Sequence, residues 1–489
     1  MEDSVLSIDF GTSYTVCCFY RTGNCEFCST DNGQHTIPSI ISFDPDVSYG
    51  IDDGKSVLHH LKMLIGENFE SLNNSDVDQK IFGMALVEKE DGIEVINGDK
   101  SYSVPYLITG FIQCIKEDGE KQAGRDFKDV VITVPARFTQ RQRSIYIKAV
   151  EKAGLRVVKL INEPTAAVFE LLSKYESIRN DVVLVYDLGG GTFDCSLVQV
   201  EDAKTITVLF SDGSNEIGCE RFDELVLEYI IKEIEKKGLK CKDRAKCRRS
   251  YSSVLKDIRN AKESISKRSV DIDVSKIISG CPEFQVTITE TVLYGILEPK
   301  IKETLKIVDN MLAKVKMEKS AIGYVALIGG GSLLPIVKKC VTSSFQESRV
   351  IDTANPKEIV AKGALKSYLQ HDITIKSVTY YNYSLELYNG KCYTIIPRGT
   401  PIPMDKPLRK RFMPERSGQV KVETAFYQGL SDNSSENQLV KKIEFDISKL
   451  KGSKYFYIEL YVDGRDMISI KAYENEPGDI LYENEVSIP

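Results

Sequence analysis

The stretch VLSIDFGTSY, residues 5–14, decides the fold of this chain, and LVYDLGGGTFD, residues 184–194, repeats its design. In each, an apolar run typical of a buried strand ends in an aspartate, Asp9 or Asp187, and a turn of glycine and hydroxyl residues follows. Glycine lets a ligand approach the backbone closely, and successive N–H groups in such a turn form a nest for an anion. A carboxylate beside that nest suits a hydrated Mg²⁺ ion. The pair predicts two hairpins, one from each half of a duplicated fold, that hold one polyphosphate from opposite sides.

Length and composition favour a multi-domain protein. With 489 residues the chain is long enough for more than one core, and no apolar run is long enough to span a bilayer. The acidic start, Met1–Ser4, is neither a secretory signal nor a transit peptide, so we expect a cytoplasmic protein without a membrane partner, whose cysteines are reduced thiols. The net charge of −7 argues against general nucleic-acid binding, and we expect no specific DNA partner.

The order of predicted elements changes once along the chain. Strands and amphipathic helices alternate up to about residue 370, with a strand over 130–135, a helix over 140–152 and a strand over 157–161. Glu163 then opens another helix, with proline in its first turn. This alternation indicates an α/β fold. From Val378 onward, strands rich in Tyr, Val and Ile indicate an all-β module, and we expect the joint at 371–377.

Two motifs suggest chemistry that we do not assign. Cys25 and Cys28 have the spacing of a redox or zinc motif, but a zinc site needs a second ligand pair and none is well placed. We interpret them as part of a β-hairpin over 15–30 that turns at 22–24. The segment 50–56 is similar to a phosphate-binding P-loop but is one residue short and has two aspartates where phosphate would lie, which favours a surface turn.

Four motifs resemble those of the heat shock protein 70 chaperones: Asp9–Tyr14, Val131–Phe138, Ile161–Ala167 and Asp187–Asp194. Pro397–Pro403 resembles the substrate-binding β domain of that family, so the similarity covers the whole chain. The resemblance implies an actin/hexokinase-like, two-lobed ATPase domain over 1–370, a linker over 371–377, and a β-sandwich over 378–489. It also implies slow ATP hydrolysis.

The resemblance implies a complete hydrolytic centre, made of Asp9, Lys62, Glu163, Asp187, Thr192 and Asp194. Asp9 and Asp187 would hold Mg²⁺ through water and help coordinate K⁺, and Glu163 would order a magnesium-bound water. Lys62 would orient the attacking water, with Thr192 and Asp194 near the γ-phosphate. Without the resemblance, Lys62 would be interpreted as a solvated helix lysine.

The same resemblance assigns a set of residues to ATP or ADP itself: Gly11, Thr12, Ser13, Tyr14, Gly189, Gly190, Gly191, Lys262, Ser266, Gly329, Gly330 and Gly331. The adenosine side departs from the family pattern. Glu263 and Leu333 replace two arginines that contact adenine, and Arg259 replaces a glutamate. Each lost stack removes about 1–2 kcal/mol, so we expect weakened nucleotide binding. Alternatively, Arg259 and Glu263 form an i,i+4 ion pair.

Further features bear on how the two parts cooperate. Pro135 and Arg143 match family residues that relay the nucleotide state between domains. The joint lacks the family's consecutive leucines, but Ile373 and Ile375 could dock as a strand edge. We expect a chain without the helical lid that follows the β domain in most of the family, and the stretch 380–387 is more polar than the usual peptide-groove strand.

These features favour an ATP-binding chaperone similar to the lidless, ribosome-associated type. Its partners would be a J-domain co-chaperone, a nucleotide exchange factor, nascent or unfolded polypeptides and the ribosome. The alternatives are a non-cycling scaffold that needs nucleotide only for its fold, and a small-molecule kinase of the same fold. The basic run Lys406–Arg411 is a candidate contact for RNA or an acidic partner.

Overall fold

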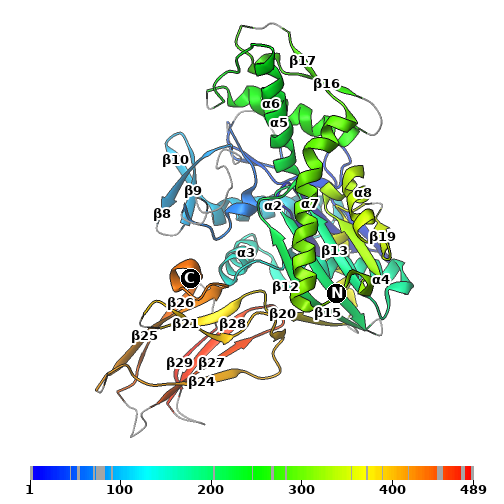
Figure 1. The fold of residues 1–489 in the computed structure, drawn as a ribbon. Coiled ribbons are helices and arrows are strands. Elements are labelled where there is room, and N and C mark those ends of the chain that lie inside the picture. Colours follow the sequence, from blue (N-terminus) through cyan, green and yellow to red (C-terminus); the bar gives the residue numbers. More distant parts are fainter. Residues whose placement is uncertain are drawn as a thin grey trace.

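A computed structural model shows an α/β part and an all-β part in contact with each other (Figure 1). The structure describes residues 4–44, 46–51, 56–69, 72, 83–89, 92–201, 204–244, 246–265, 269–280, 283–353, 355–370, 373–387, 389–416, 418–448, 455–474 and 480–485. Within these ranges, no helix is both long enough and apolar enough to cross a membrane.

The first lobe of the α/β part is built on a six-stranded sheet. Its strands are β12 (Arg156–Asn162), β11 (Asp129–Val134), β1 (Val5–Phe10), β2 (Tyr14–Arg21) and β3 (Asn24–Phe27), with β4 (Thr36–Pro38) paired to β2. Strands β1, β11 and β12 are parallel, whereas β1 and β2 form the first glycine-turn hairpin. The lobe also contains helices α2 (Val104–Ala123) and α3 (Gln140–Lys152), the 3-10 helix η2 (Leu61–Leu64), and two small sheets made of β5 (Ile41–Ser42), β6 (Ser48–Tyr49) and β7 (Val57–Leu58), and of β8 (Ala85–Lys89), β9 (Gly92–Asn97) and β10 (Lys100–Ser103).

The second lobe repeats this plan in a seven-stranded sheet. The strand order is β19 (Arg349–Asp352), β18 (Tyr324–Ile328), β13 (Val182–Leu188), β14 (Phe193–Glu201), β15 (Thr205–Ser214), β20 (Thr374–Val378) and β23 (Pro401–Ile402). Strand β13 pairs antiparallel with β14 and parallel with β18, as β1 does with β2 and β11. Around it lie α7 (Glu290–Val315), α8 (Pro335–Ser344), η4 (Glu176–Ile178), η6 (Lys319–Ala321) and η7 (Gly330–Leu333), while α5 (Cys219–Lys236), α6 (Arg248–Ser264), η5 (Ser275–Ile277) and the hairpin β16 (Val270–Asp273)–β17 (Gln285–Ile288) extend to one end (Figure 1).

Two helices join the lobes. Helix α4 (Glu163–Lys174) and helix α9 (Ile359–Leu369) share a buried cluster with strands of both sheets, including Val5, Val131 and Val185. The helices touch through their backbones, because a Cβ on Gly363 would overlap the carbonyl oxygen of Ala166. The expected duplicated α/β fold is therefore confirmed, with α4 and α9 between its halves.

The all-β part is a sandwich of two four-stranded sheets. One has the order β22 (Cys392–Ile396), β21 (Asn382–Glu386), β25 (Lys421–Gly429) and β26 (Gln438–Asp446), with η8 (Ser434–Glu436) before β26. The other has β24 (Leu408–Phe412), β27 (Phe456–Val462), β28 (Ile468–Tyr473) and β29 (Ile480–Glu485). Alternate residues of both sheets, such as Leu385, Phe426, Ile458 and Ile470, form one buried core. The predicted fold class is correct in both parts.

The connection between the two parts is itself a strand. β20 lies parallel to β15, with Ile375 opposite Ile206, and antiparallel to β23. The expectation that Ile373 and Ile375 dock at a strand edge is confirmed, because both also pack against the buried cluster of α4 and α9. Residues 371 and 372 lie outside the described residues.

Smaller sequence predictions have mixed outcomes. The hairpin over 15–30 is present as β2 and β3, and its turn uses positive φ at Thr22 and Gly23. All the cysteines that the structure describes are free thiols, and Cys17 and Cys28 have their Sγ atoms 3.2 Å apart. The segment over 50–56 lies mostly outside the described residues.

Candidate functional site

The two glycine turns face each other across the cleft between the lobes. A Cβ on Gly190 would overlap the hydroxyl oxygen of Ser13, and one on Gly191 would lie 2.8 Å from Cγ2 of Thr12. Each turn is also tight in itself: a Cβ on Gly11 would overlap the carbonyl oxygen of Tyr14, and the Gly189 amide donates to the Thr192 carbonyl over 2.9 Å. A side chain would clash at Gly11, Gly190 and Gly191, so the predicted hairpins do meet from opposite sides.

Four carboxylates gather beside the turns. Asp9 ends β1 and accepts a 2.6 Å hydrogen bond from Thr133, Glu163 opens α4, and Asp187 lies opposite Asp194 in the β13–β14 ladder. Burial raises the pKa of Asp187 well above its ordinary value, and the negative charges of the other three carboxylates raise it further. Burial also raises the pKa of Glu163, to about 7, although a neighbouring lysine opposes this. Among the described residues no three acidic, histidine or cysteine side chains converge as direct ligands of a metal ion, so this group suits a hydrated cation held through water, which would relieve the repulsion.

Lys62 is part of this group. Its Nζ atom lies 2.6 Å from Oε1 of Glu163, and the residue is only 7% exposed. Burial alone would lower the pKa of Lys62, but Glu163 and Asp9 outweigh burial and raise it, so the ammonium stays charged. The alternative interpretation of Lys62 as a solvated helix lysine is wrong, since it lies in the buried 3-10 helix η2.

A third glycine loop supports the second hairpin. Gly329 has φ of 75°, and a Cβ there would overlap the Asp187 carboxylate. A Cβ on Gly331 would lie 2.7 Å from Sγ of Cys219, and one on Gly330 would lie 3.0 Å from Cε of Lys357. The structure therefore brings the predicted loop of Gly329, Gly330 and Gly331 against the cleft.

The adenosine side is arranged differently from the expectation. Lys262 is 4% exposed, pairs with Asp223 over 2.6 Å and donates to the Cys219 carbonyl over 2.8 Å. Arg259 also pairs with Asp223, over 3.3 Å, so the alternative of an Arg259–Glu263 pair is not what the structure shows. Glu263 is exposed, and Leu333 is 54% exposed. Ser266, also predicted here, lies outside the described residues.

Sequence reasoning missed a polar bridge that closes the cleft. Ser13 of the first turn hydrogen-bonds through its hydroxyl to Glu220, and the other Glu220 oxygen lies 2.8 Å from Nδ1 of His60. Glu220 lies in the first turn of α5, whose first two amides donate to the carbonyls of Gly189 and Gly190 over 3.0 and 2.9 Å. The bridge therefore links both turns. His60 stands two residues before Lys62 and belongs to no sequence motif that would have predicted this bridge.

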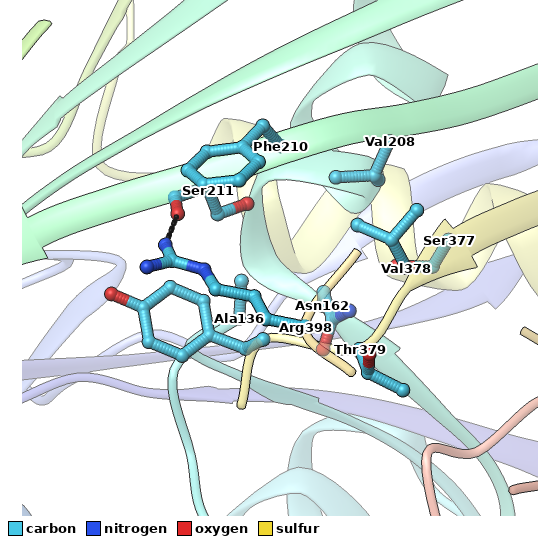
Figure 2. A pocket seen from close by; sticks show the side chains of 10 residues that line it. Ala136, Asn162, Val208, Phe210, Ser211, Ser377, Val378, Thr379 and Arg398 are labelled. Atoms are coloured by element: carbon cyan, nitrogen blue, oxygen red, sulfur yellow. Dashed lines mark hydrogen bonds between the residues drawn. The ribbon is translucent and has the colours of Figure 1, made fainter. Parts of the chain in front are cut away.

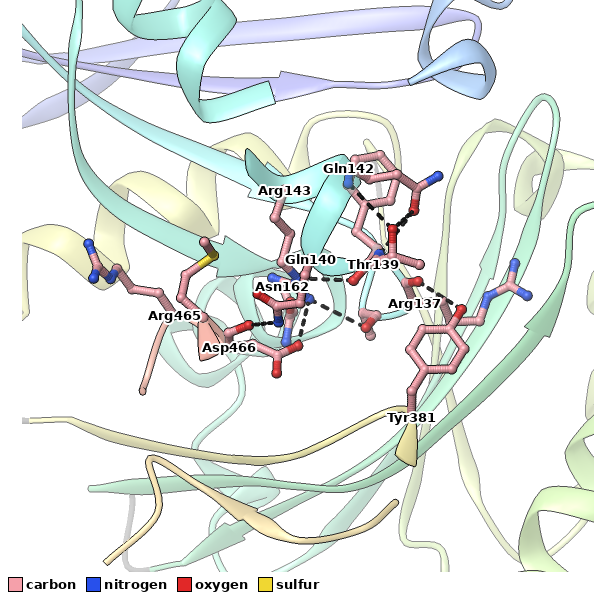
Figure 3. A network of polar contacts seen from close by, with 12 residues as sticks. Arg137, Thr139, Gln140, Gln142, Arg143, Asn162, Tyr381, Arg465 and Asp466 are labelled. Carbon is pink, nitrogen blue, oxygen red and sulfur yellow. Dashed lines mark hydrogen bonds and ion pairs between the residues drawn. The ribbon is translucent and has the colours of Figure 1, made fainter. Parts of the chain in front are cut away.

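The cleft also borders the β-sandwich. Arg143, predicted as a relay residue, has a guanidinium nitrogen 3.2 Å from Oδ2 of Asp466 (Figure 3). Gln140 donates through its backbone amide to Gln428 over 2.9 Å and through its side chain to Tyr383 over 2.8 Å. Pro135, the other predicted relay residue, lines a small cavity that reaches Glu163, Asp187 and Asp194.

A second small cavity lies between the two parts of the chain (Figure 2). In it the guanidinium of Arg398 lies between two aromatic rings, 4.2 Å from the centre of Phe210 and 4.6 Å from that of Tyr380. It also donates to the carbonyl of Ser211 over 2.8 Å. Arg398 comes from the stretch that resembles the family's β domain, so this stretch forms part of the interface.

Comparison with known proteins identifies the class. A family model described as "Hsp70 protein" matches residues 5–487, so the chain belongs to the Hsp70 family of chaperones. Members of this family generally bind ATP or ADP with Mg²⁺ and hydrolyse ATP.

Several curated relatives are ribosome-associated by name. A ribosome-associated molecular chaperone of Eremothecium gossypii is 28% identical over 97% of this chain and 80% of its own length. A ribosome-associated molecular chaperone of Saccharomyces cerevisiae is 27% identical over the same shares. A heat shock 70 kDa protein of Neurospora crassa is 28% identical over 97% of this chain and 76% of its own length.

Proposed function

We propose that this chain is an ATP-binding molecular chaperone that hydrolyses ATP slowly and assists the folding of nascent polypeptides in the cytoplasm. The observation that carries the proposal is the buried Lys62–Glu163 pair among Asp9, Asp187 and Asp194, at the point where the two glycine turns meet. Buried charges cost stability, and clusters of titratable groups with shifted pKa values gather at functional sites.

Each side chain has a role in this proposal. Asp9, Asp187 and Glu163 would hold Mg²⁺, with Asp9 and Asp187 also holding K⁺; the metal supplies positive charge to the phosphate oxygens. Lys62 would orient the attacking water, and its contact with Glu163 fixes its position. Thr192 and Asp194 would lie at the γ-phosphate, with Gly11, Thr12, Ser13 and Tyr14 at the β-phosphate.

The names of the relatives support one of the proposed partners, the ribosome. These names place the relatives at the ribosome, and we propose the same for this chain, together with a J-domain co-chaperone and a nucleotide exchange factor. The sandwich would bind unfolded polypeptide.

One observation bears on the alternative of a non-cycling scaffold. The glycine turns lie against each other, and the bridge from Ser13 through Glu220 to His60 links them. Exchange of nucleotide between the turns would require this bridge to open, so a bridge that stays closed would favour the scaffold. The docked β-sandwich gives no support to a small-molecule kinase.

Single-turnover ATP cleavage by the purified chain, with and without a J-domain protein, separates these functions. We expect slow cleavage that the J-domain protein accelerates, and co-sedimentation of the chain with ribosomes. ATP binding without cleavage under both conditions would support the scaffold. Absence of nucleotide binding would contradict both.

A further inference from the structure

Arg137 reaches across the cleft from the first lobe to the second. It lies between β11 and α3, and its Nε atom donates to Oδ1 of Asp194 over 2.8 Å. One of its terminal nitrogens donates to the side-chain oxygen of Asn215, at the end of β15, over 2.5 Å. Both partners belong to the second lobe, so this one side chain links the lobes at the Asp194 end of the cleft.

The loop that carries Arg137 is held firmly. The amide of Phe138 donates to the Pro135 carbonyl over 3.0 Å, and Thr139 caps α3 in a capping box with Gln142. From the β-sandwich side, the hydroxyl of Tyr381 donates to the Arg137 carbonyl over 3.1 Å, and Figure 3 shows Tyr381 reaching toward this loop. The guanidinium is therefore presented to Asp194 from a fixed backbone.

The charged side chains of the cleft form two ion pairs and leave two carboxylates outside them. Lys62 pairs with Glu163, and Arg137 pairs with Asp194. Within the part of the chain that the structure describes, neither Asp9 nor Asp187 forms an ion pair, which leaves these two carboxylates for a divalent cation. A terminal phosphate beside Asp194 would meet like charge unless a cation cancelled that carboxylate. Arg137 is in position to do so.

We propose that Arg137 is a specificity-determining residue that lets the site accept a triphosphate in preference to a diphosphate, by cancelling the charge of Asp194. The inference rests on the proposed function, because it places the γ-phosphate near Asp194. It assigns no chemical step to Arg137. The residue acts on which nucleotide binds.

The test is calorimetric binding of ATP·Mg²⁺ and ADP·Mg²⁺ to the full chain. Arg137→Gln retains a hydrogen-bond donor but removes the charge, and it should weaken ATP binding about tenfold while ADP binding changes less than about twofold. Arg137→Lys keeps the charge and should retain most of the preference for ATP. Arg141→Ala, in the first turn of α3, is the matched control and should change neither affinity.

The decisive variant is Arg137→Gln combined with Asp194→Asn. If Arg137 acts by cancelling the Asp194 charge, this double variant should recover ATP affinity to within about threefold of the unmodified chain. If Arg137→Gln weakens both nucleotides equally, or if the double variant shows no recovery, the inference is overturned. An unmodified chain that binds ATP without cleaving it would contradict the proposed hydrolysis alone, whereas one that binds neither nucleotide would contradict both proposals.

Discussion

At the scale of single residues, burial determines what the charged groups of the cleft can do. Glu163 has a pKa near 7 because it is buried, and its carboxylate accepts a hydrogen bond from the equally buried Lys62. Removing either partner leaves an uncompensated buried group, which is costly. Lys62 and Glu163 therefore hold each other in position, and the proposed ATP hydrolysis can use this fixed arrangement.

Lys62→Ala should lower the single-turnover rate of ATP cleavage by about 100-fold or more, since Lys62 acts on the attacking water and the γ-phosphate. ATP affinity should stay within about threefold, because the glycine turns hold the other phosphates. Quenched-flow or filter assays with limiting ATP measure the rate. Lys121→Ala, a lysine on the exposed face of α2, serves as control. A variant that cleaves ATP normally would remove Lys62 from the mechanism.

Asp187→Asn should raise the melting temperature of the nucleotide-free chain, because it removes a carboxyl group whose charged form is destabilised by burial and by three neighbouring carboxylates. The same change should reduce the additional stabilisation by millimolar ATP·Mg²⁺ by about half or more. Differential scanning calorimetry measures both effects. Asp271→Asn, on the distant β16–β17 hairpin, should change neither. A full ATP response in Asp187→Asn would show that Asp187 does not hold the metal.

Some of these residues could be predicted from the sequence and others could not, and the difference has a physical reason. Asp9 and Asp187 were predictable because each ends an apolar strand and precedes a glycine turn, a pattern contained in about ten neighbouring residues. Arg137 and Asp194 are 57 positions apart, and Ser13 and Glu220 are 207 apart. Such contacts depend on how two lobes close, which no local pattern encodes. The Arg259–Asp223 pair lies within the second lobe, and it depends instead on how α5 and α6 pack against each other.

At the scale of elements, helix α6 directs its cations to a neighbouring helix, where the sequence predicted a contact with the nucleotide. Its hydrophobic residues Val254, Ile258 and Ala261 pack into the core of the second lobe, and Lys262 and Arg259 both turn to Asp223 of α5. Glu263 is exposed and carries a carboxylate, so it cannot supply a cation that would stack on the adenine base. The element was predicted, but the partner of Arg259 was not, because a pairing across two packed helices is not encoded in the sequence of either helix alone.

Glu263→Arg combined with Leu333→Arg should tighten ATP by about 1–3 kcal/mol if both guanidinium planes stack on the base. Both positions are exposed, so the longer side chains have room. Unmodified chain should prefer ATP over GTP only weakly, and the double variant should prefer it strongly. Calorimetry with both nucleotides measures this. Tight and strongly adenine-selective binding by the unmodified chain would show that other groups recognise the base.

At the scale of the whole molecule, the β-sandwich docks on the first lobe through buried polar contacts. Burial raises the pKa of Asp466 to about 6 from an ordinary value of 3.8, and the Arg143 charge opposes this only in part. When docking is undone, water returns to Asp466 and its pKa falls back. Docking and proton binding at Asp466 are therefore linked.

Docking of the β-sandwich should weaken as pH rises from about 4 to 6. In this window the docked form keeps the proton on Asp466, whereas the undocked form releases it. Above about pH 6 docking should stay weakened. The docking constant should fall by up to about 100-fold, the equivalent of two pKa units. Small-angle X-ray scattering at pH 5 and 7.5 reports the fraction docked. Asp466→Asn should dock equally at both values, and Asp405→Asn, which changes an exposed carboxylate of the sandwich, should behave like the unmodified chain. A pH response that persists in Asp466→Asn would locate the linkage elsewhere.

The backbone contact between α4 and α9 lies between the two lobes, in a buried cluster that both sheets share. A Cβ on Gly363 would overlap the carbonyl oxygen of Ala166, so a larger residue at position 363 would force the two helices apart. Helix α4 begins at Glu163, three residues before Ala166, so a displaced α4 would carry a carboxylate of the cleft with it. A single methyl group added at Gly363 should therefore disturb the position of Glu163 although residue 363 itself lies outside the nucleotide site.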